Sequence, residues 1–338
     1  MKNKKTAVLL INVGSPDAPT IPAVRRYLTE FLNDKRVIDL PFLLRKFLVN
    51  LIIIPFRVKN STKLYQQLWT RKGSPLIYLS NELREKLQNK MAENTDVYVG
   101  MRYGNPNFKK ALLEIKARNY QKIVLLPLFP QHAMSTTETS FVAAEKAIKK
   151  MGITAEINKV GQFYKHPKFI EAFAQQALKY DISSFDHVLF SYHGLPNRHL
   201  EKCHPGIKVT ACNCSETMPE YGKQCYRATC YETSRLIATR LKLRASDYSV
   251  AFQSRLSNNW LMPFTDAVLN EKLNQGKKKI LVLAPSFVTD CLETTLEIGV
   301  EYAEDFERKG GSLQLVESLN TEDTWVEALT EIIMNKQN

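Results

Sequence analysis

The chain has 338 residues, of which 44% are hydrophobic and 24% are charged, and its formal net charge is +13. This length is enough for two domains of ordinary size, and the composition is that of a globular enzyme without disordered or low-complexity regions. A basic chain suits an acidic small molecule, a membrane lipid or nucleic acid, but the sequence has no long run of like charges and no zinc-finger, helix-turn-helix or RNA-binding motif. We therefore expect no nucleic-acid partner.

The N-terminal residues indicate a location. Met1–Lys5 lead into the apolar stretch Ala7–Val13, which is too short for the apolar region of a signal peptide and lacks a small-residue cleavage site. We expect a cytoplasmic protein. In a reducing cytosol, clustered cysteines bind metal more often than they form disulfides.

Residues 40–56, LPFLLRKFLVNLIIIPF, form the most apolar long segment. Arg45 and Lys46 interrupt it, and it is shorter than the roughly 20 apolar residues that a membrane-spanning helix needs. Two readings stay open. Leu40–Phe56 is either a buried helix or a patch that makes loose peripheral membrane contact, with Arg45, Lys46 and Arg57 meeting anionic head groups.

Strand-like and helix-like patterns alternate along the chain. After Pro22, apolar residues at positions 24, 27, 28, 31 and 32 have helical spacing. Short, nearly continuous apolar runs are typical of parallel strands buried on both faces. We expect strands at Ala7–Val13, Val97–Gly100, Lys122–Phe129, Ala155–Val160, His187–Tyr192, Tyr248–Phe252, Lys279–Ala284 and Leu313–Glu317. This alternation predicts an α/β fold.

The two halves of the sequence resemble each other. VLLINVGSP near the start matches VLFSYHGLP at residues 188–196 in pattern. We therefore predict two similar domains, residues 1–165 and 166–338, each with a four-stranded parallel sheet flanked by helices. A final helix, about Thr324–Met334, packs on one of them. No strand is followed by GxGxxG, so a dinucleotide site has little support.

Ligands of open α/β sheets bind at the carboxyl ends of the strands. One such loop contains His193, which ends a predicted strand and is followed at once by Gly194 and Pro196. A histidine there is either a structural residue or a group that transfers protons or binds metal, because its pKa near 6.5 permits both.

A second loop leads into a line of carboxylates. Glu293, Glu297 and Glu301 repeat every four residues and stack on one face of a helix, and no Lys or Arg lies between Asp290 and Glu307 to offset their repulsion. The line is either a solvated surface or, because apolar residues make the helix partly buried, a path for cations or protons.

Five of the six cysteines lie within residues 203–230, spaced C-x8-C-x-C-x10-C-x4-C. Four thiolates hold either Zn²⁺ or a [2Fe–2S] cluster, and the spacing does not separate the two.

Several motifs in order resemble the ferrochelatase family, over roughly residues 6–330. They are NVGSPDAPTIPAVRRYLTEFLNDKRVID, MRYGNPNF, SYHGLP, FQSRL…WLMPFTD and DCLETTLEI. The resemblance implies an enzyme of two Rossmann-like domains, with the porphyrin in a cleft between them, that inserts Fe²⁺ into protoporphyrin IX and releases two protons at the end of haem synthesis.

The resemblance also implies roles for single residues. His193 and Glu293 match the family's catalytic and metal-contacting pair, and Asp290, Glu297 and Glu301 belong to its proton or metal path. The residues that match porphyrin or propionate contacts are Val13, Ser74, Arg102, Tyr103, Trp260 and Phe287.

The cysteine-bearing stretch 203–225 resembles an insertion of those bacterial ferrochelatases that carry an internal [2Fe–2S] cluster. The resemblance implies Cys203, Cys212, Cys214 and Cys225 as ligands, and leaves Cys230 as the spare. Insertion of Fe²⁺ needs no redox step, so we expect a structural or sensing role for the cluster.

Two departures from the family stand out. His132 is a second metal contact or a surface residue, and Cys291 is an inert buried thiol or a weak site for soft metals. The competing functions are a chelatase for coproporphyrin or cobalt and a non-catalytic haem or iron–sulfur sensor.

Overall fold

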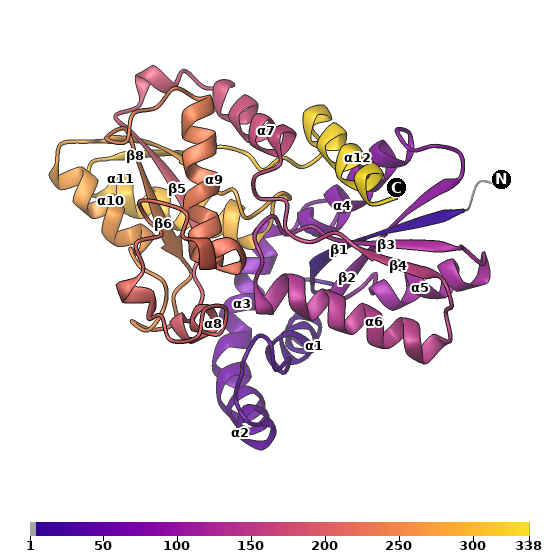
Figure 1. Cartoon of the computed structure of the whole chain (residues 1–338). Coiled ribbons are helices and arrows are strands. Elements are labelled where there is room, and N and C mark those ends of the chain that lie inside the picture. The colour runs from indigo at the N-terminus through magenta and orange to yellow at the C-terminus, as the bar shows by residue number, and fades with distance from the viewer. Residues whose placement is uncertain (1–4, 338) are drawn as a thin grey trace. The chain divides into compact units, whose positions relative to one another are not determined.

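A computed structural model describes residues 5–337 of the chain (Figure 1). The chain divides into two compact units. Unit 1 contains the residues up to Phe129, Met134–Gln162 and the residues from Leu329 on, and unit 2 contains Pro130–Ala133 and Phe163–Ala328. We describe each unit by itself.

Unit 1 contains a four-stranded parallel sheet in the order β2-β1-β3-β4. Its strands are β1 (Thr6–Ser15), β2 (Thr95–Gly104), β3 (Lys122–Pro127) and β4 (Glu156–Lys159). The central strand β1 is buried over almost its whole length, because helices cover both faces of the sheet.

The helices of unit 1 follow the strands in crossover connections. They are α1 (Ile21–Leu32), α2 (Phe42–Phe47), the π-helical η1 (Leu48–Ile53), α3 (Ile54–Leu68), α4 (Pro75–Gln88), α5 (Phe108–Ala117), the π-helical η2 (Met134–Glu138) and α6 (Thr139–Met151). Alternate β1 residues Ala7, Leu9 and Ile11 pack in one core with apolar residues of α5 and α6. As predicted, α1 begins with a proline in its first turn.

Unit 2 repeats this arrangement with the strand order β6-β5-β7-β8, again parallel throughout. Its strands are β5 (His187–His193), β6 (Tyr248–Gln253), β7 (Lys279–Leu283) and β8 (Ser312–Leu315). The longer helical segments are α7 (Pro167–Leu178), α9 (Tyr226–Arg240), α10 (Thr265–Asn274), the π-helical η6 (Glu293–Tyr302) and α11 (Ala303–Arg308). The short segments are η3 (Ile182–Ser184), α8 (Asn197–Glu201), η4 (Val209–Ala211) and η5 (Glu220–Gln224).

The last helix, α12 (Asp323–Gln337), contributes residues to both units. The sequence predictions of eight strands, two similar sheets and a C-terminal helix are confirmed. The two sheets share one strand order. In each sheet the order of the strands reverses at one point, which lies between β1 and β3 in unit 1 and between β5 and β7 in unit 2. Ligands of such sheets bind outside the carboxyl ends of the strands at this point.

The apolar segment Leu40–Phe56 is not a buried helix, so that reading is wrong. It runs through α2 and η1 into α3, and although Val49 and Ile54 are buried, seven of its large apolar side chains are exposed, including Leu43 at 79% and Phe56 at 83%. Arg45 is also not where we expected it: it is 7% exposed, and its guanidinium donates to the Leu40 carbonyl oxygen at 2.7 Å. Among residues 5–337, no helix is both long and apolar enough to cross a membrane.

Candidate active site

The carboxyl ends of β5 and β6 lie side by side in unit 2. His193 is the last residue of β5 and pairs in register with Gln253, the last residue of β6. The next residue, Gly194, donates its N–H to the Gln253 carbonyl oxygen at 2.8 Å. A Cβ atom on residue 194 would lie 2.7 Å from that same oxygen, so the close approach of the two strand ends requires glycine.

The imidazole of His193 is half-buried between two aromatic side chains. The ring centroids of Trp260 and Phe287 each lie 6.4 Å from that of the imidazole. His193 Nδ1 lies 2.6 Å from the Gly194 carbonyl oxygen, which can only accept a hydrogen bond. This contact requires a proton on Nδ1, so whenever the ring carries a single proton, Nε2 has a lone pair for a proton or a metal ion.

The carboxylate line lies on a π-helix. Glu293, Glu297 and Glu301 belong to η6, in which the wider turn still brings residues four apart onto nearly one face. Glu293 and Glu297 are half-buried and Glu301 is exposed, so the line runs from the interior of unit 2 to its surface. Partial loss of hydration raises the pKa of Glu301, although the residue is exposed, and the neighbouring charges of Glu297 and Glu304 raise it further.

Glu297, the middle carboxylate of the line, accepts a hydrogen bond at each of its two oxygens. Ser254 Oγ donates to Glu297 Oε2 at 2.5 Å, and Tyr302 OH donates to Glu297 Oε1 at 3.2 Å. Asp290 is also engaged, because it accepts the Asn320 side-chain amide at 2.7 Å and the Ser318 N–H at 3.2 Å. Asp290 thus anchors the start of the line to the loop after β8.

Cys291 is 6% exposed, and burial, together with the nearby Glu293 charge, raises the pKa of its thiol. This supports the expectation of an inert buried thiol. His132 is half-buried, and both of its expected roles stay predictions.

Arg102 in unit 1 has an acidic partner that we did not identify from sequence. Its guanidinium forms an ion pair with Asp34, and its Nε donates to Thr139 Oγ1 at 2.9 Å. Asp34 also accepts hydrogen bonds from Thr139 Oγ1 at 2.6 Å, from Tyr103 OH at 3.0 Å and from the Arg36 N–H at 2.8 Å. Burial alone would raise the pKa of Asp34, but these hydrogen bonds and the Arg102 charge lower it.

Tyr103 is only 1% exposed, so Arg102 and Tyr103 form part of the packed interior of unit 1. The signal for Asp34 was its position in NDKRVID, one of the motifs that carry the family resemblance.

Ser74 lines a cavity of about 500 Å³ in unit 1, beside Pro16 and Asn105, which follow β1 and β2. It is the N-cap residue of α4 and is 3% exposed, and its hydroxyl has no hydrogen-bond partner. Val13 is half-buried near the end of β1. A buried hydroxyl without a hydrogen-bond partner therefore lies beside this cavity, at the N-terminus of α4.

The cysteines of residues 203–225 sit among hydrogen-bond donors. Arg227 Nη1 donates to Cys214 Sγ at 3.2 Å, and Tyr221 OH donates to Cys212 Sγ at 3.4 Å. Burial, together with the neighbouring Cys212 and Cys225, raises the pKa of Cys214 to about 12, against the opposing charge of Arg227.

Cys203 is half-buried, whereas Cys230 is fully buried in α9. Within residues 5–337, no group of three or more His, Cys, Asp or Glu side chains has the arrangement of a metal site. The donors around the sulfur atoms nevertheless suit anionic thiolates, so the donor chemistry fits a thiolate-bound group.

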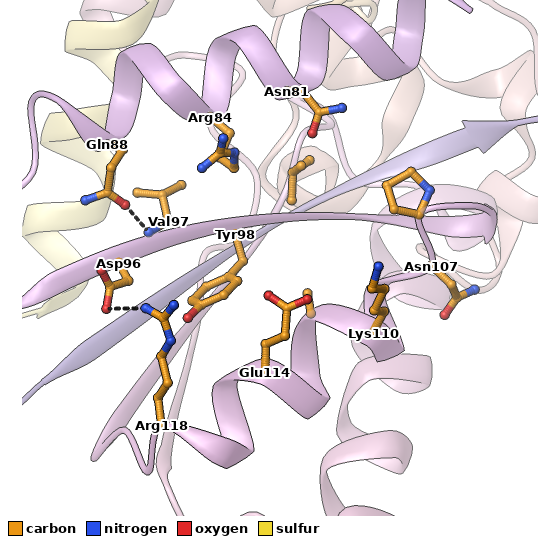
Figure 2. A pocket seen from close by; sticks show the side chains of 13 residues that line it. Asn81, Arg84, Gln88, Asp96, Val97, Tyr98, Asn107, Lys110, Glu114 and Arg118 are labelled. Carbon is orange, nitrogen blue, oxygen red and sulfur yellow. Dashed lines mark hydrogen bonds and ion pairs between the residues drawn. The ribbon is translucent and has the colours of Figure 1, made fainter.

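A further cavity, of about 440 Å³, lies between α4 and α5 at the edge strand β2 (Figure 2). Gln88 covers part of the strand edge by accepting the Val97 N–H at 2.7 Å and donating to the Thr95 carbonyl at 3.0 Å. Arg118 and Asp96 form a loose ion pair at 3.8 Å. None of the predicted site residues lines this cavity.

The chain is similar to named bacterial proteins over nearly its full length. It is 43% identical to a ferrochelatase of Coxiella burnetii (strain Dugway 5J108-111), covering 98% of this chain and 93% of that protein. It is 41% identical to a ferrochelatase of Legionella pneumophila (strain Lens), and this match covers 97% of this chain and 98% of that protein.

Among solved structures, the sirohydrochlorin chelatase SirB from Bacillus subtilis subspecies spizizenii, in complex with cobalt, superposes with a TM-score of 0.55 at 10% identity. The match covers 99% of this chain and 96% of that one, and it concerns the fold alone. The ferrochelatase family model matches residues 5–337. The chain therefore belongs to the ferrochelatase family, whose members are metal chelatases that insert iron into a porphyrin in haem synthesis.

Proposed function

We propose that this chain inserts Fe²⁺ into protoporphyrin IX to give protohaem, and that His193 and Glu293 are its catalytic residues. The observation that carries the assignment is the contact between His193 Nδ1 and the Gly194 carbonyl oxygen at 2.6 Å. Because Nδ1 is bonded to the Gly194 carbonyl oxygen, Nε2 is free to accept a proton, and two aromatic side chains flank the ring.

The reaction exchanges one cation for two protons. Each of two pyrrole nitrogens loses its proton, Fe²⁺ forms bonds to the ring nitrogens, and the net charge is conserved. The His193 imidazole accepts one proton and the Glu293 carboxylate accepts the other. Glu297 and Glu301 continue from Glu293 toward the surface of unit 2, which supports a path for protons or metal along η6.

The remaining predicted contacts concern the macrocycle. Trp260 and Phe287 offer apolar faces beside His193. The unpartnered hydroxyl of Ser74 supports a hydrogen bond to a propionate. Arg102 already has Asp34 as a partner, so we propose that it acts on the porphyrin chiefly by orienting neighbouring side chains of unit 1.

The test is an anaerobic assay of the purified protein with Fe²⁺ and protoporphyrin IX, in which loss of porphyrin fluorescence reports insertion. We expect turnover that disappears in His193→Ala while porphyrin binding is kept. Parallel assays with coproporphyrin and with Co²⁺ compare the related chelatase activities. Tight porphyrin binding without turnover under every condition would mean that the chain is a sensor.

We propose further that Cys203, Cys212, Cys214 and Cys225 hold a [2Fe–2S] cluster. The hydrogen bonds from Arg227 and Tyr221 to the sulfur atoms support anionic ligands there. Iron and sulfide content and the visible spectrum of protein purified without oxygen test this. Cys203→Ser should lose the cluster and Cys230→Ser should keep it, and the reverse result would show that Cys230 is the ligand.

Finally, we propose a cytoplasmic protein that makes loose membrane contact through Leu40–Phe56. Exposed apolar side chains on α2, η1 and α3 support this contact. Cosedimentation with anionic phospholipid vesicles measures it: the double variant Phe42→Ser/Phe56→Ser should stay in the supernatant, whereas Leu178→Ser, which changes an exposed leucine of α7, should bind as the wild type does. Equal sedimentation of both variants would refute the contact.

A further inference from the structure

Two consecutive residues at the carboxyl end of β6 both contact the π-helix that carries the acidic line. Gln253 Nε2 donates to the carbonyl oxygen of Glu293 at 3.2 Å. Ser254 Oγ donates to Glu297 Oε2 at 2.5 Å. The end of β6 is therefore bonded to successive turns of η6, once through the main chain of η6 and once through a side chain.

Gln253 also bonds to the strand that carries His193. Its main-chain oxygen accepts the Gly194 N–H at 2.8 Å, and its Oε1 accepts the hydroxyl of Ser191 at 2.7 Å. Gln253 is 1% exposed and Ser191 is fully buried, so water does not compete for these bonds. A glutamine suits this position because a single side chain both accepts from β5 and donates to η6.

Ser254 has an unusual backbone. Its φ is +61°, a left-handed conformation that costs free energy for any residue with a Cβ atom. Such a conformation persists where surrounding contacts determine it, and it clusters at functional sites. Here it accompanies the short hydrogen bond to Glu297, whose other oxygen is held by Tyr302 at 3.2 Å.

We propose that Gln253 and Ser254 are positioning residues for metal insertion. Gln253 fixes the start of η6, and so Glu293, relative to the strand end that carries His193. Ser254 fixes the carboxylate of Glu297. This inference rests on the proposed roles of His193, Glu293 and Glu297, and neither positioning residue needs to touch the reacting atoms for it to hold.

The first experiment compares two glutamines that each accept one hydrogen bond and donate another. Gln253→Met keeps the size of the side chain and removes both of its hydrogen bonds. The matched control is Gln88→Met, because Gln88 likewise accepts the Val97 N–H at 2.7 Å and donates to the Thr95 carbonyl oxygen at 3.0 Å, beside a cavity that no predicted site residue lines. Displacement of a reacting group by about 1 Å can cost on the order of 100-fold in rate.

We expect Gln253→Met to lower kcat between about 10- and 100-fold while the Kd for protoporphyrin IX stays within about twofold. Gln88→Met should leave kcat unchanged, even where both variants lose thermal stability. Equal loss of kcat in both variants, or a loss in Gln253→Met that is confined to porphyrin Kd, would overturn the role of Gln253.

The second experiment separates the Ser254 hydroxyl from its backbone. Ser254→Gly removes the hydroxyl and adopts the left-handed conformation freely, so a loss of kcat in this variant comes from the side chain. Because Ser254 acts through Glu297, the double variant Ser254→Gly/Glu297→Gln should be no slower than Glu297→Gln alone. Full kcat in Ser254→Gly, or losses that multiply in the double variant, would contradict the proposal.

The outcomes distinguish the two levels of inference. Turnover retained in His193→Ala would overturn the proposed catalytic pair, whatever the Gln253 and Ser254 variants do. Loss of turnover in His193→Ala, together with wild-type kcat in Gln253→Met and Ser254→Gly, would leave the catalytic pair intact and overturn the positioning roles alone.

Discussion

The Asp34–Arg102 pair gives a quantitative prediction for unit 1. The variant Asp34→Asn keeps the shape of the side chain and removes the charge that accepts bonds from Arg102, Tyr103 and Thr139. Removing one partner of a buried pair costs about 3–5 kcal/mol. The Arg102 side chain is 17% exposed, so water partly compensates, and we expect a loss of about 2–4 kcal/mol in the unfolding free energy of unit 1.

The effect depends on pH in a direction that follows from the Asp34 pKa. Because that pKa is lower in the folded chain than in the unfolded one, the stabilisation is present above about pH 4 and is lost as the pH falls through the folded value. The difference between wild type and Asp34→Asn should therefore be full at pH 7 and shrink below pH 4.

Hydrogen exchange of β1 and β3 peptides in increasing urea, read by mass spectrometry, measures unit 1 separately from unit 2. The control is Glu145→Gln, whose ion pair with Lys159 at 2.8 Å is 42% and 49% exposed and should contribute at most about 1 kcal/mol. A loss in Asp34→Asn no larger than in the control, or one that is the same at pH 3 and pH 7, would refute the reasoning.

Three further predictions concern unit 2. Gly194→Ala introduces a methyl group 2.7 Å from the Gln253 carbonyl oxygen, so urea unfolding should show a loss of about 1–3 kcal/mol, and wild-type stability would rule out the close approach. Trp325→Ala removes a fully buried indole ring, whose centroid lies 5.6 Å from that of Phe163. We expect the unfolding free energy to fall by about 3–5 kcal/mol, and a fall below about 1 kcal/mol would contradict the place of Trp325 in the core. Glu301→Gln removes a carboxyl that is more costly to ionise in the folded chain, so Tm should rise at pH 7 and not below pH 4, where the group is protonated in both states; a rise that is equal at both pH values would count against a raised pKa.

The strands were predictable because each parallel strand is a nearly continuous apolar run that is buried on both faces. The same apolar signal misled the reading of Leu40–Phe56 as a buried helix, since hydrophobicity alone does not tell a core segment from an exposed one. Residues such as Leu43 and Phe56 are as apolar as core residues, and only the tertiary structure shows that they are exposed.

The sequence named the residues of the candidate site but did not reveal their contacts. The spacing of Glu293 and Glu297 fits an α-helix and a π-helix alike, so the π-helical turn of η6 could not be foreseen. Arg102 and its partner Asp34 are 68 positions apart in the chain, and nothing local in the sequence links these two residues. Ser254 gave no signal either, because a left-handed backbone is unexpected at a serine.

The equal strand orders of the two sheets align the matching segments VLLINVGSP and VLFSYHGLP, and in that alignment Val13 occupies the position of His193. Each of these residues lies near the carboxyl end of the central strand of its sheet and is followed directly by a glycine. This is the pattern expected of an internal duplication after which the copies diverged. After such a duplication, two positions that began alike hold an imidazole in unit 2 and an aliphatic side chain in unit 1, so only one of the two strand ends carries an ionisable group.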